Sequence, residues 1–286
     1  MLEFFGLKDF HDGGFHFIRE AEGAWSWQHI TFVSLCLAVM FALAIFFGLR
    51  NKNQTDKKKN KVLIVSAFLI NGFEIVKIVV LCIRAQDPLK WLYVLPLFLC
   101  SIQLIAIPMA AFCKGRLKEA CLDFVFTFGI LGAIFGTVGA TQNYSAYPVL
   151  SMDNVFSGVT HSISGFASLY IGISGMRSMK RKNFPITLSV LLGFSILAYV
   201  ANLALDYNYM FLMNHDDTPY SIIWNLVGGN PVIYPLVVVG IFVLYLGLFY
   251  LIDGKIAAVK RKKAEAAVQP AEQANPEIAG EEDKAA

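Results

Sequence analysis

Seven long apolar runs constrain this chain more than any other feature of its sequence. They lie, to within a few residues, at 29–49, 62–83, 92–113, 119–140, 155–176, 184–205 and 231–252. A run of about 20 apolar residues is long enough to cross the hydrocarbon core of a bilayer as a helix. Only 16% of the 286 residues are charged, against about 25% in an ordinary soluble domain. The sequence therefore predicts an all-α, polytopic membrane protein, a bundle of seven transmembrane helices.

The distribution of lysine and arginine predicts how this bundle is oriented. The stretches 50–61, 114–118 and 177–183 and the tail from residue 253 together carry 19 of these residues, whereas the alternate stretches carry four. Basic residues are enriched in the cytoplasmic loops of membrane proteins. We therefore expect the N-terminus outside and the C-terminus in the cytoplasm, in a multi-pass protein of the cell membrane.

Three parts of the chain are expected from these patterns. Residues 1–28 carry acidic residues and no basic start, so they are predicted to be an extracytoplasmic interfacial segment rather than a signal peptide. Residues 29–252 form the membrane domain. Residues 253–286 begin basic and turn acidic and alanine-rich, which predicts a disordered cytoplasmic tail. The basic start follows from topology, so no nucleic-acid partner is expected.

Polar residues inside the predicted spans are the candidates for function, because an ionisable group in a membrane helix costs a few kcal/mol or more. Asn71, Glu74 and Lys77 are spaced by three in the second span, so they share one helical face. Two interpretations remain open. Glu74 and Lys77 form an internal pair that stabilises packing, or they form the charged wall of a polar cavity.

The third and fifth spans each carry a reactive residue at a similar depth. Cys100 lies about eight residues into the third span, with Pro96 one turn above and Gln103 one turn below on the same helical face. A proline frees a backbone carbonyl, which is tolerated where another group satisfies it. His161 lies among small residues in "VFSGVTHSISGFASL". The bland alternatives are that the cysteine is a small hydrophobe and that the histidine belongs to a helix-packing stripe.

The polar groups gather in the outer half of the predicted bundle, and no comparable cluster is expected in the inner half. Those in the outer half are His29, Lys77, Cys100, His161, Asp206 and Tyr209, with Glu74 and Gln103 just below and Asn202 on the face of Asp206. A short interfacial helix at 219–227 is expected to cover this end. We therefore predict one polar cavity that opens to the outer leaflet. A cysteine beside a histidine is the minimal arrangement for acyl transfer.

The same residues carry a resemblance to a known family. His29, Glu74, "LPLFLCS", "THSISG" and, above all, "NYMFL" at 208–212, followed by "TP" and "GNPVIYP", resemble the YwaF-type bacterial membrane proteins, relatives of the transmembrane protein 164 acyltransferases. The resemblance covers roughly 28–250. It implies that Cys100 and His161 are catalytic for acyl transfer between glycerophospholipids. The sequence departs from the bacterial pattern at Phe98, where a histidine often stands.

The leading hypothesis is a membrane acyltransferase or transacylase whose substrates are membrane lipids. Cys100 is the expected nucleophile and His161 the base, with Glu74 or Asp206 orienting the imidazole and Lys77, Asn208 or backbone amides holding a phosphate or an oxyanion. His29, Gln103, Asn202 and Tyr209 are expected to support the site. No cofactor or metal is expected. The alternatives are a transporter or scramblase for a lipid-linked or small polar substrate, or a lipid hydrolase.

Overall fold

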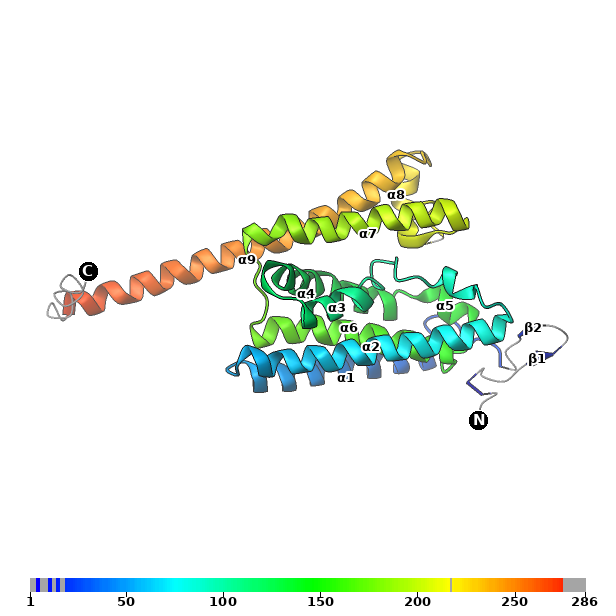
Figure 1. The fold of residues 1–286 in the computed structure, drawn as a ribbon, viewed down its shortest axis with the longest axis horizontal. Coiled ribbons are helices and arrows are strands. Elements are labelled where there is room, and N and C mark those ends of the chain that lie inside the picture. Colours follow the sequence, from blue (N-terminus) through cyan, green and yellow to red (C-terminus); the bar gives the residue numbers. More distant parts are fainter. Residues whose placement is uncertain (1–3, 6–9, 12–13, 16–18, 217, 275–286) are drawn as a thin grey trace.

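Long apolar helices dominate the computed structural model, which describes residues 4–5, 10–11, 14–15, 19–216 and 218–274 (Figure 1). Among the described residues, five helical segments are long and apolar enough to cross a membrane, so the chain is a multi-pass membrane protein. The main helices of these segments are α1 (Trp27–Asn51), α2 (Asp56–Ala85), α4 (Gly115–Thr137), α7 (Phe184–Leu205) and α9 (Ile233–Ala274). These five helices correspond to five of the seven long apolar runs that the sequence predicted to cross the membrane.

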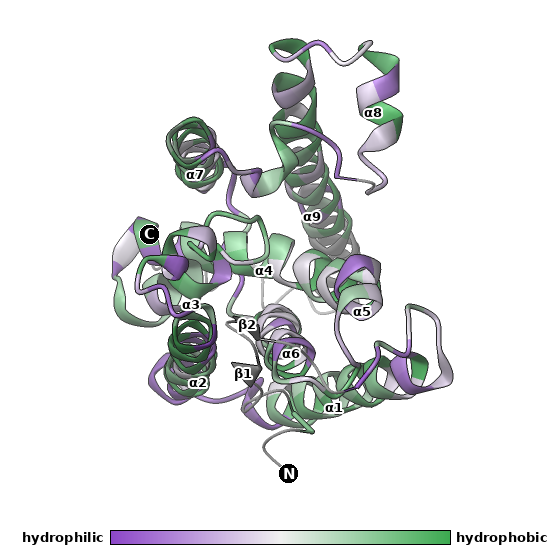
Figure 2. Cartoon of the chain, turned by 90° about the vertical axis from the view of Figure 1, so that its right-hand side faces the viewer, coloured by the Kyte–Doolittle hydropathy of each residue, from purple (hydrophilic) through white to green (hydrophobic). Residues whose placement is uncertain are grey.

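The central helix of the bundle is rich in small polar residues. α6 (Met152–Ser174) is 23 residues long and contains serine, threonine, glycine and histidine residues. It contacts α1, α2, α3 and α4, which surround it in the end-on view (Figure 2). Because α6 faces protein rather than lipid, its polar side chains are met by neighbouring helices instead of by hydrocarbon. Its bounds agree with the run at 155–176 to within a few residues.

The run at 92–113 is not one continuous helix, contrary to the sequence-based expectation. It consists of the 3-10 helix η1 (Lys90–Tyr93), an irregular stretch of turns at 94–102, and the short helix α3 (Gln103–Phe112). Cys100 therefore lies in a turn before α3, and it does not share a helical face with Pro96 and Gln103. Proline lacks the N–H that a helix interior requires, which favours a break near Pro96.

The second proline of this run is accommodated inside α3. Pro108 cannot donate to the carbonyl of Leu104, four residues earlier in the helix. Asn71 on α2 replaces the missing donor, because its side-chain Nδ2 lies 3.1 Å from that carbonyl oxygen. Non-helical or interrupted backbone at membrane depth needs such partners. The spacing of Asn71 on the polar face of α2 thus has a structural role.

The shorter elements and the two ends of the chain complete the fold. They are β1 (Phe10–His11), β2 (Gly14–Phe15), α5 (Thr141–Ala146), η2 (Arg181–Asn183), η3 (Tyr209–Phe211) and α8 (Ser221–Leu226). α8 falls within the helix expected at 219–227. α9 continues to Ala274, so the structure has helix over 253–274 where disorder was expected. Residues 275–286 lie outside the described residues, as does part of the predicted segment 1–28.

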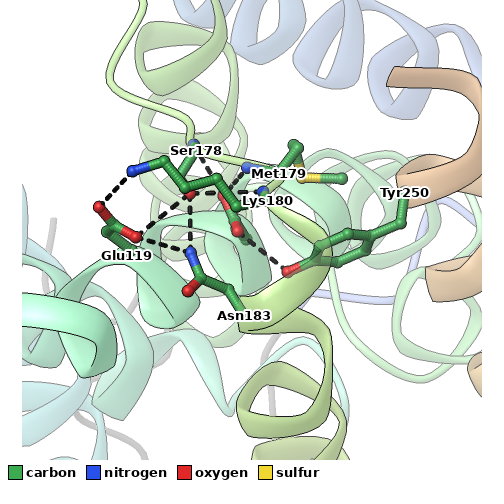
Figure 3. Close-up of polar contacts among 7 residues, drawn as sticks. Glu119, Ser178, Met179, Lys180, Asn183 and Tyr250 are labelled. Atoms are coloured by element: carbon green, nitrogen blue, oxygen red, sulfur yellow. Dashed lines mark hydrogen bonds and ion pairs between the residues drawn. The ribbon is translucent and has the colours of Figure 1, made fainter. Parts of the chain in front are cut away.

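The half of the bundle expected to be cytoplasmic contains a dense polar network, which the sequence analysis did not anticipate (Figure 3). Asp123 on α4 is fully buried and accepts hydrogen bonds from the Ser178 N–H at 2.9 Å, the Met179 N–H at 2.8 Å and the Tyr250 hydroxyl at 2.9 Å. Nearby, Glu119 pairs with Lys180 at 2.7 Å. The network ties the α6–α7 connection and α9 to α4. The donors to Asp123 are two backbone N–H groups and one tyrosine hydroxyl. We call this network the polar clamp, because it holds these parts of the fold together.

Candidate functional site

A small polar cavity lies between α2, the turn before α3, and α6. Its polar lining comes from all three: Glu74, Lys77, Cys100, Ser101, Thr160, His161 and Ser164. The cavity volume is about 30 Å³, enough for one or two water molecules. The structure thus brings Glu74, Lys77, Cys100 and His161 together, four of the residues that the sequence analysis singled out.

Cys100 and His161 both line this cavity. Each group acts electrostatically on the other, and the thiol Sγ lies 3.9 Å from Oγ of Ser101. The Nδ1 atom of His161 lies 2.7 Å from the backbone carbonyl oxygen of Ser157. A carbonyl only accepts, so the proton of the neutral ring is assigned to Nδ1 and Nε2 is left with a lone pair. The free nitrogen is available to take the thiol proton.

The partner that orients the imidazole is therefore a backbone carbonyl one turn earlier on α6, where a carboxylate of Glu74 or Asp206 was expected. Glu74 instead forms an ion pair with Lys77, with 2.6 Å between Oε1 and Nζ. Both members of this pair line the cavity. The two interpretations of the pair, internal packing and charged wall, thus describe the same arrangement.

Lys77 extends its influence to the reactive pair. Its charge acts on both the Cys100 thiol and the His161 imidazole. A nearby cation stabilises a thiolate and disfavours an imidazolium. Lys77 is therefore placed to stabilise negative charge that develops on or next to Cys100, while Glu74 holds the ammonium at the cavity wall.

Two glycines of α4 pack against the reactive pair, and the sequence analysis missed both. A Cβ added at Gly132 would lie 3.1 Å from the Cβ of Cys100, and one added at Gly136 would overlap the ring of His161. The two positions are one turn apart on the same face of α4. The signal was present as "GAIFG", a small-xxx-small pattern that permits close helix approach in membranes. Their lack of side chains leaves room for the pair.

The remaining predicted residues lie outside the cavity lining. His29 is buried at the start of α1, where its Nδ1 accepts from the Trp25 N–H at 2.9 Å and its ring packs 4.0 Å from the Tyr144 ring. Gln103 is fully buried at the start of α3. Neither side chain is part of the cavity wall. Residues that were predicted to share one depth therefore do not all line one cavity.

The polar residues at the end of α7 form a separate turn. Asp206 ends the helix in the left-handed conformation, with φ +50°. The Nδ2 group of Asn208 lies 2.7 Å from the Asp216 carboxylate, and its Oδ1 accepts from the Met213 N–H at 2.8 Å. Asn202 and Tyr209 bind each other, as described below. None of these residues lines the cavity. The sixth span therefore contributes no residue to the cavity wall, contrary to the expectation.

Fold and site together define a class: a multi-pass helical membrane protein with a thiol and an imidazole facing each other in a polar cavity. Residues 24–251 match the model of the TMEM164 family, and the chain belongs to that family. The matched range includes every residue of the cavity. No curated protein and no solved structure showed a significant match to the chain.

Proposed function

We propose that this protein is a membrane-embedded acyltransferase or transacylase that acts on glycerophospholipids or related lipids. The observation that carries the proposal is the placement of Cys100 and His161 in one cavity, with the imidazole held by the Ser157 carbonyl. A nucleophile, a base and a group that orients the base form the general arrangement for nucleophilic catalysis. Family membership and the resemblance to acyltransferases of that family support the same chemistry.

The reaction needs no group beyond the two lipids and these side chains. Nε2 of His161 takes the thiol proton as Sγ of Cys100 attacks the acyl carbonyl carbon. The ester C–O bond then breaks, the leaving alcohol receives the proton from His161, and the acyl group remains on Cys100 as a thioester. In the second half, a hydroxyl of the acceptor gives its proton to His161 and attacks the thioester. The C–S bond breaks and the sulfur regains a proton.

Negative charge on the acyl oxygen has two sources of stabilisation near Cys100. Lys77 supplies a cation at the cavity wall. Within the described stretch 94–102, the backbone N–H groups of Leu99, Cys100 and Ser101 make no hydrogen bond. Unpaired N–H groups next to the nucleophile are the usual donors to an oxyanion. The break in the helix thus exposes donors that a continuous helix would have used.

The proposal includes a topology of seven crossings in the cell membrane, with the N-terminus outside. Five crossings are the long apolar helices, and the other two are α6 and the interrupted segment from η1 to α3. With this orientation the cavity lies nearer the outer leaflet. A volume of about 30 Å³ is smaller than a lipid, so most of the substrate lies outside the cavity when its ester reaches Cys100, which is half-buried.

A transporter or scramblase is the alternative from another class. The interrupted span at 90–112 is the observation that favours it, because discontinuous helices form substrate sites in transporters. A lipid hydrolase differs from the first proposal only in using water as the acceptor. A covalent acyl group on Cys100 separates the two classes, since acyl transfer by this mechanism requires it and transport does not.

The deciding experiment is intact-protein mass spectrometry of purified protein after exposure to membrane lipids. The wild type is expected to carry an acyl adduct and to exchange acyl chains between lipids, whereas Cys100→Ser does neither. His161→Ala should lose as much activity as Cys100→Ser, and the double variant no more, because the two residues act as a unit. Cys82→Ser and Cys113→Ser are matched controls, since both cysteines are free and half-buried but lie outside the cavity. Full exchange by Cys100→Ser, or equal loss in all three cysteine variants, would refute the mechanism.

A further inference from the structure

The motif "NYMFL" has a role that the proposed chemistry does not use. Its tyrosine, Tyr209, meets the backbone at two residues that precede Pro96. The Tyr209 hydroxyl donates to the carbonyl oxygen of Leu92 at 2.5 Å and accepts from the N–H of Leu95 at 3.1 Å. Leu92 is the residue whose carbonyl Pro96 would leave unpaired in a continuous helix. One hydroxyl therefore satisfies two backbone groups at the break in the third span.

Tyr209 is itself held in place by a fixed partner. It is fully buried. Its N–H donates to Oδ1 of Asn202 at 2.6 Å, and its carbonyl accepts from Nδ2 of the same residue at 3.0 Å. The next two residues, Met210 and Phe211, have φ values of +56° and +55°, a conformation that non-glycine residues rarely adopt unless their surroundings impose it. Burial raises the pKa of Tyr209 to about 12, so the hydroxyl keeps its proton at neutral pH.

The contact reaches toward Cys100 through an aromatic side chain. The Tyr209 ring lies 5.2 Å from the ring of Phe98, and the Phe211 ring lies 5.7 Å from it. Phe98 opens the turn that contains Cys100, because its carbonyl accepts from the N–H of Ile102 at 3.0 Å. The turn that presents the thiol is thus fixed from one side by Tyr209 and Phe211, and from the other by the start of α3.

We infer that Tyr209 is a positioning residue that sets the place of the Cys100 thiol relative to His161, by fixing the backbone at Leu92 and Leu95. The inference rests on the proposed function, for which the relative position of the two groups matters. Without the hydroxyl, the stretch 92–95 loses both contacts and the turn at 98–102 is no longer held in register with α6. The segment after α7 would then affect the reaction by positioning Cys100, not by contacting the substrate.

The test compares Tyr209→Phe with Tyr170→Phe. The first variant keeps the ring and its contact with Phe98 and removes only the hydroxyl. Tyr170 is an equally buried tyrosine whose hydroxyl also donates to a backbone carbonyl, that of Lys59 at 3.0 Å. Alkylation of purified protein by N-ethylmaleimide is followed by peptide mass spectrometry at Cys100 and at Cys36, over a series of pH values. Acyl exchange is measured in parallel as kcat and KM.

Tyr209→Phe should slow the alkylation of Cys100 at least about tenfold and change its pH dependence, because a positioned base contributes about 10²–10⁴-fold. Cys36 should react as in the wild type, and Tyr170→Phe should change neither site. The loss in acyl exchange should fall on kcat rather than KM. Should Tyr209→Phe not give monodisperse protein, Asn202→Asp, which removes the donor to the Tyr209 carbonyl, is judged by the same measurements.

Thiol alkylation separates this inference from the proposed function. If Cys100 alkylation changes in Tyr209→Phe but the wild type shows no acyl exchange, the positioning role stands and the proposed function fails. Unchanged Cys100 alkylation in a folded Tyr209→Phe would overturn the positioning role. An equal change at Cys36 would overturn it too, because the effect would then be a general loosening of the fold.

Discussion

Adding one methyl group at Gly136 should disable the site while leaving the fold intact. A Cβ there would lie 2.7 Å from Cγ of His161 and closer still to Cδ2 and Nε2. Non-bonded carbon atoms pack at about 3.5–4.0 Å, so in Gly136→Ala the ring must move by about 1 Å or more. That movement breaks either the hydrogen bond to Ser157 or the contact with Cys100. A misplacement of about 1 Å costs about 10²-fold in rate, which corresponds to about 2.7 kcal/mol of activation free energy.

The stability of the same variant distinguishes this local effect from unfolding. Replacing glycine by alanine inside a helix gains about 1 kcal/mol from helix propensity, whereas overpacking costs about 1–3 kcal/mol. The net cost is therefore about 0–2 kcal/mol, so Tm in detergent should fall by no more than several degrees. Gly193→Ala is the matched control, because a Cβ at this position of α7 meets nothing within 4 Å. A folded Gly136→Ala protein with the wild-type rate of acyl exchange would refute the reasoning.

Three further predictions concern topology, the polar clamp and pH. A cysteine at position 145 (Ser145→Cys) should react with a membrane-impermeant thiol reagent applied to intact cells, and one at position 55 (Thr55→Cys) should not, because the basic stretches mark the cytoplasmic side. Asp123→Ala should lower Tm, since it leaves buried donors without an acceptor at a cost of about 1–3 kcal/mol each. Burial acts to raise the pKa of Glu22, but the Val149 N–H and Arg19 hold it below its ordinary value. Above its unfolded pKa of about 4.3, the ionised Glu22 therefore stabilises the fold. This stabilisation is lost as pH falls through the lower folded pKa, so Glu22→Gln should weaken the acid dependence of Tm.

Each of these has its own control. Reversed labelling of the two introduced cysteines would reverse the orientation and with it the assignment of the cavity to the outer leaflet. Asp123→Asn keeps one oxygen acceptor and should lower Tm less than Asp123→Ala does. If both variants have the same Tm as the wild type, the polar clamp adds no stability. An acid transition of Glu22→Gln that coincides with that of the wild type would remove Glu22 from the pH dependence.

The sequence by itself determined the class of protein and singled out Cys100 and His161, which the structure places in one cavity. Hydropathy is a local property, and about 20 apolar residues in a row have few stable conformations other than a membrane helix. The cost of placing a polar group in hydrocarbon also belongs to the residue itself. Cys100 and His161 could therefore be selected from the sequence, together with Glu74 and Lys77, whose spacing of three residues already placed them on one face of α2.

Only the tertiary structure decided which of the polar residues share a cavity. Sequence position gives the depth of a residue along a span but not the neighbours that its side chain meets. His29 and Asp206 were expected at a similar depth to Cys100, yet they lie outside the cavity lining. The two prolines of the third span did not show how far this span departs from a helix. The extent of the break depends on whether Asn71 and Tyr209 bind the backbone carbonyls that the prolines leave without a donor.

The orientation of His161 was likewise fixed by contacts that no residue pattern specified. Its partner is the backbone carbonyl of Ser157. Every residue has a backbone carbonyl, so the sequence does not indicate which one binds the imidazole. The space for its ring comes from the absence of a side chain at Gly136 on another helix. Backbone groups and missing atoms act only where packing brings helices together, which is why they had to be found in the folded chain.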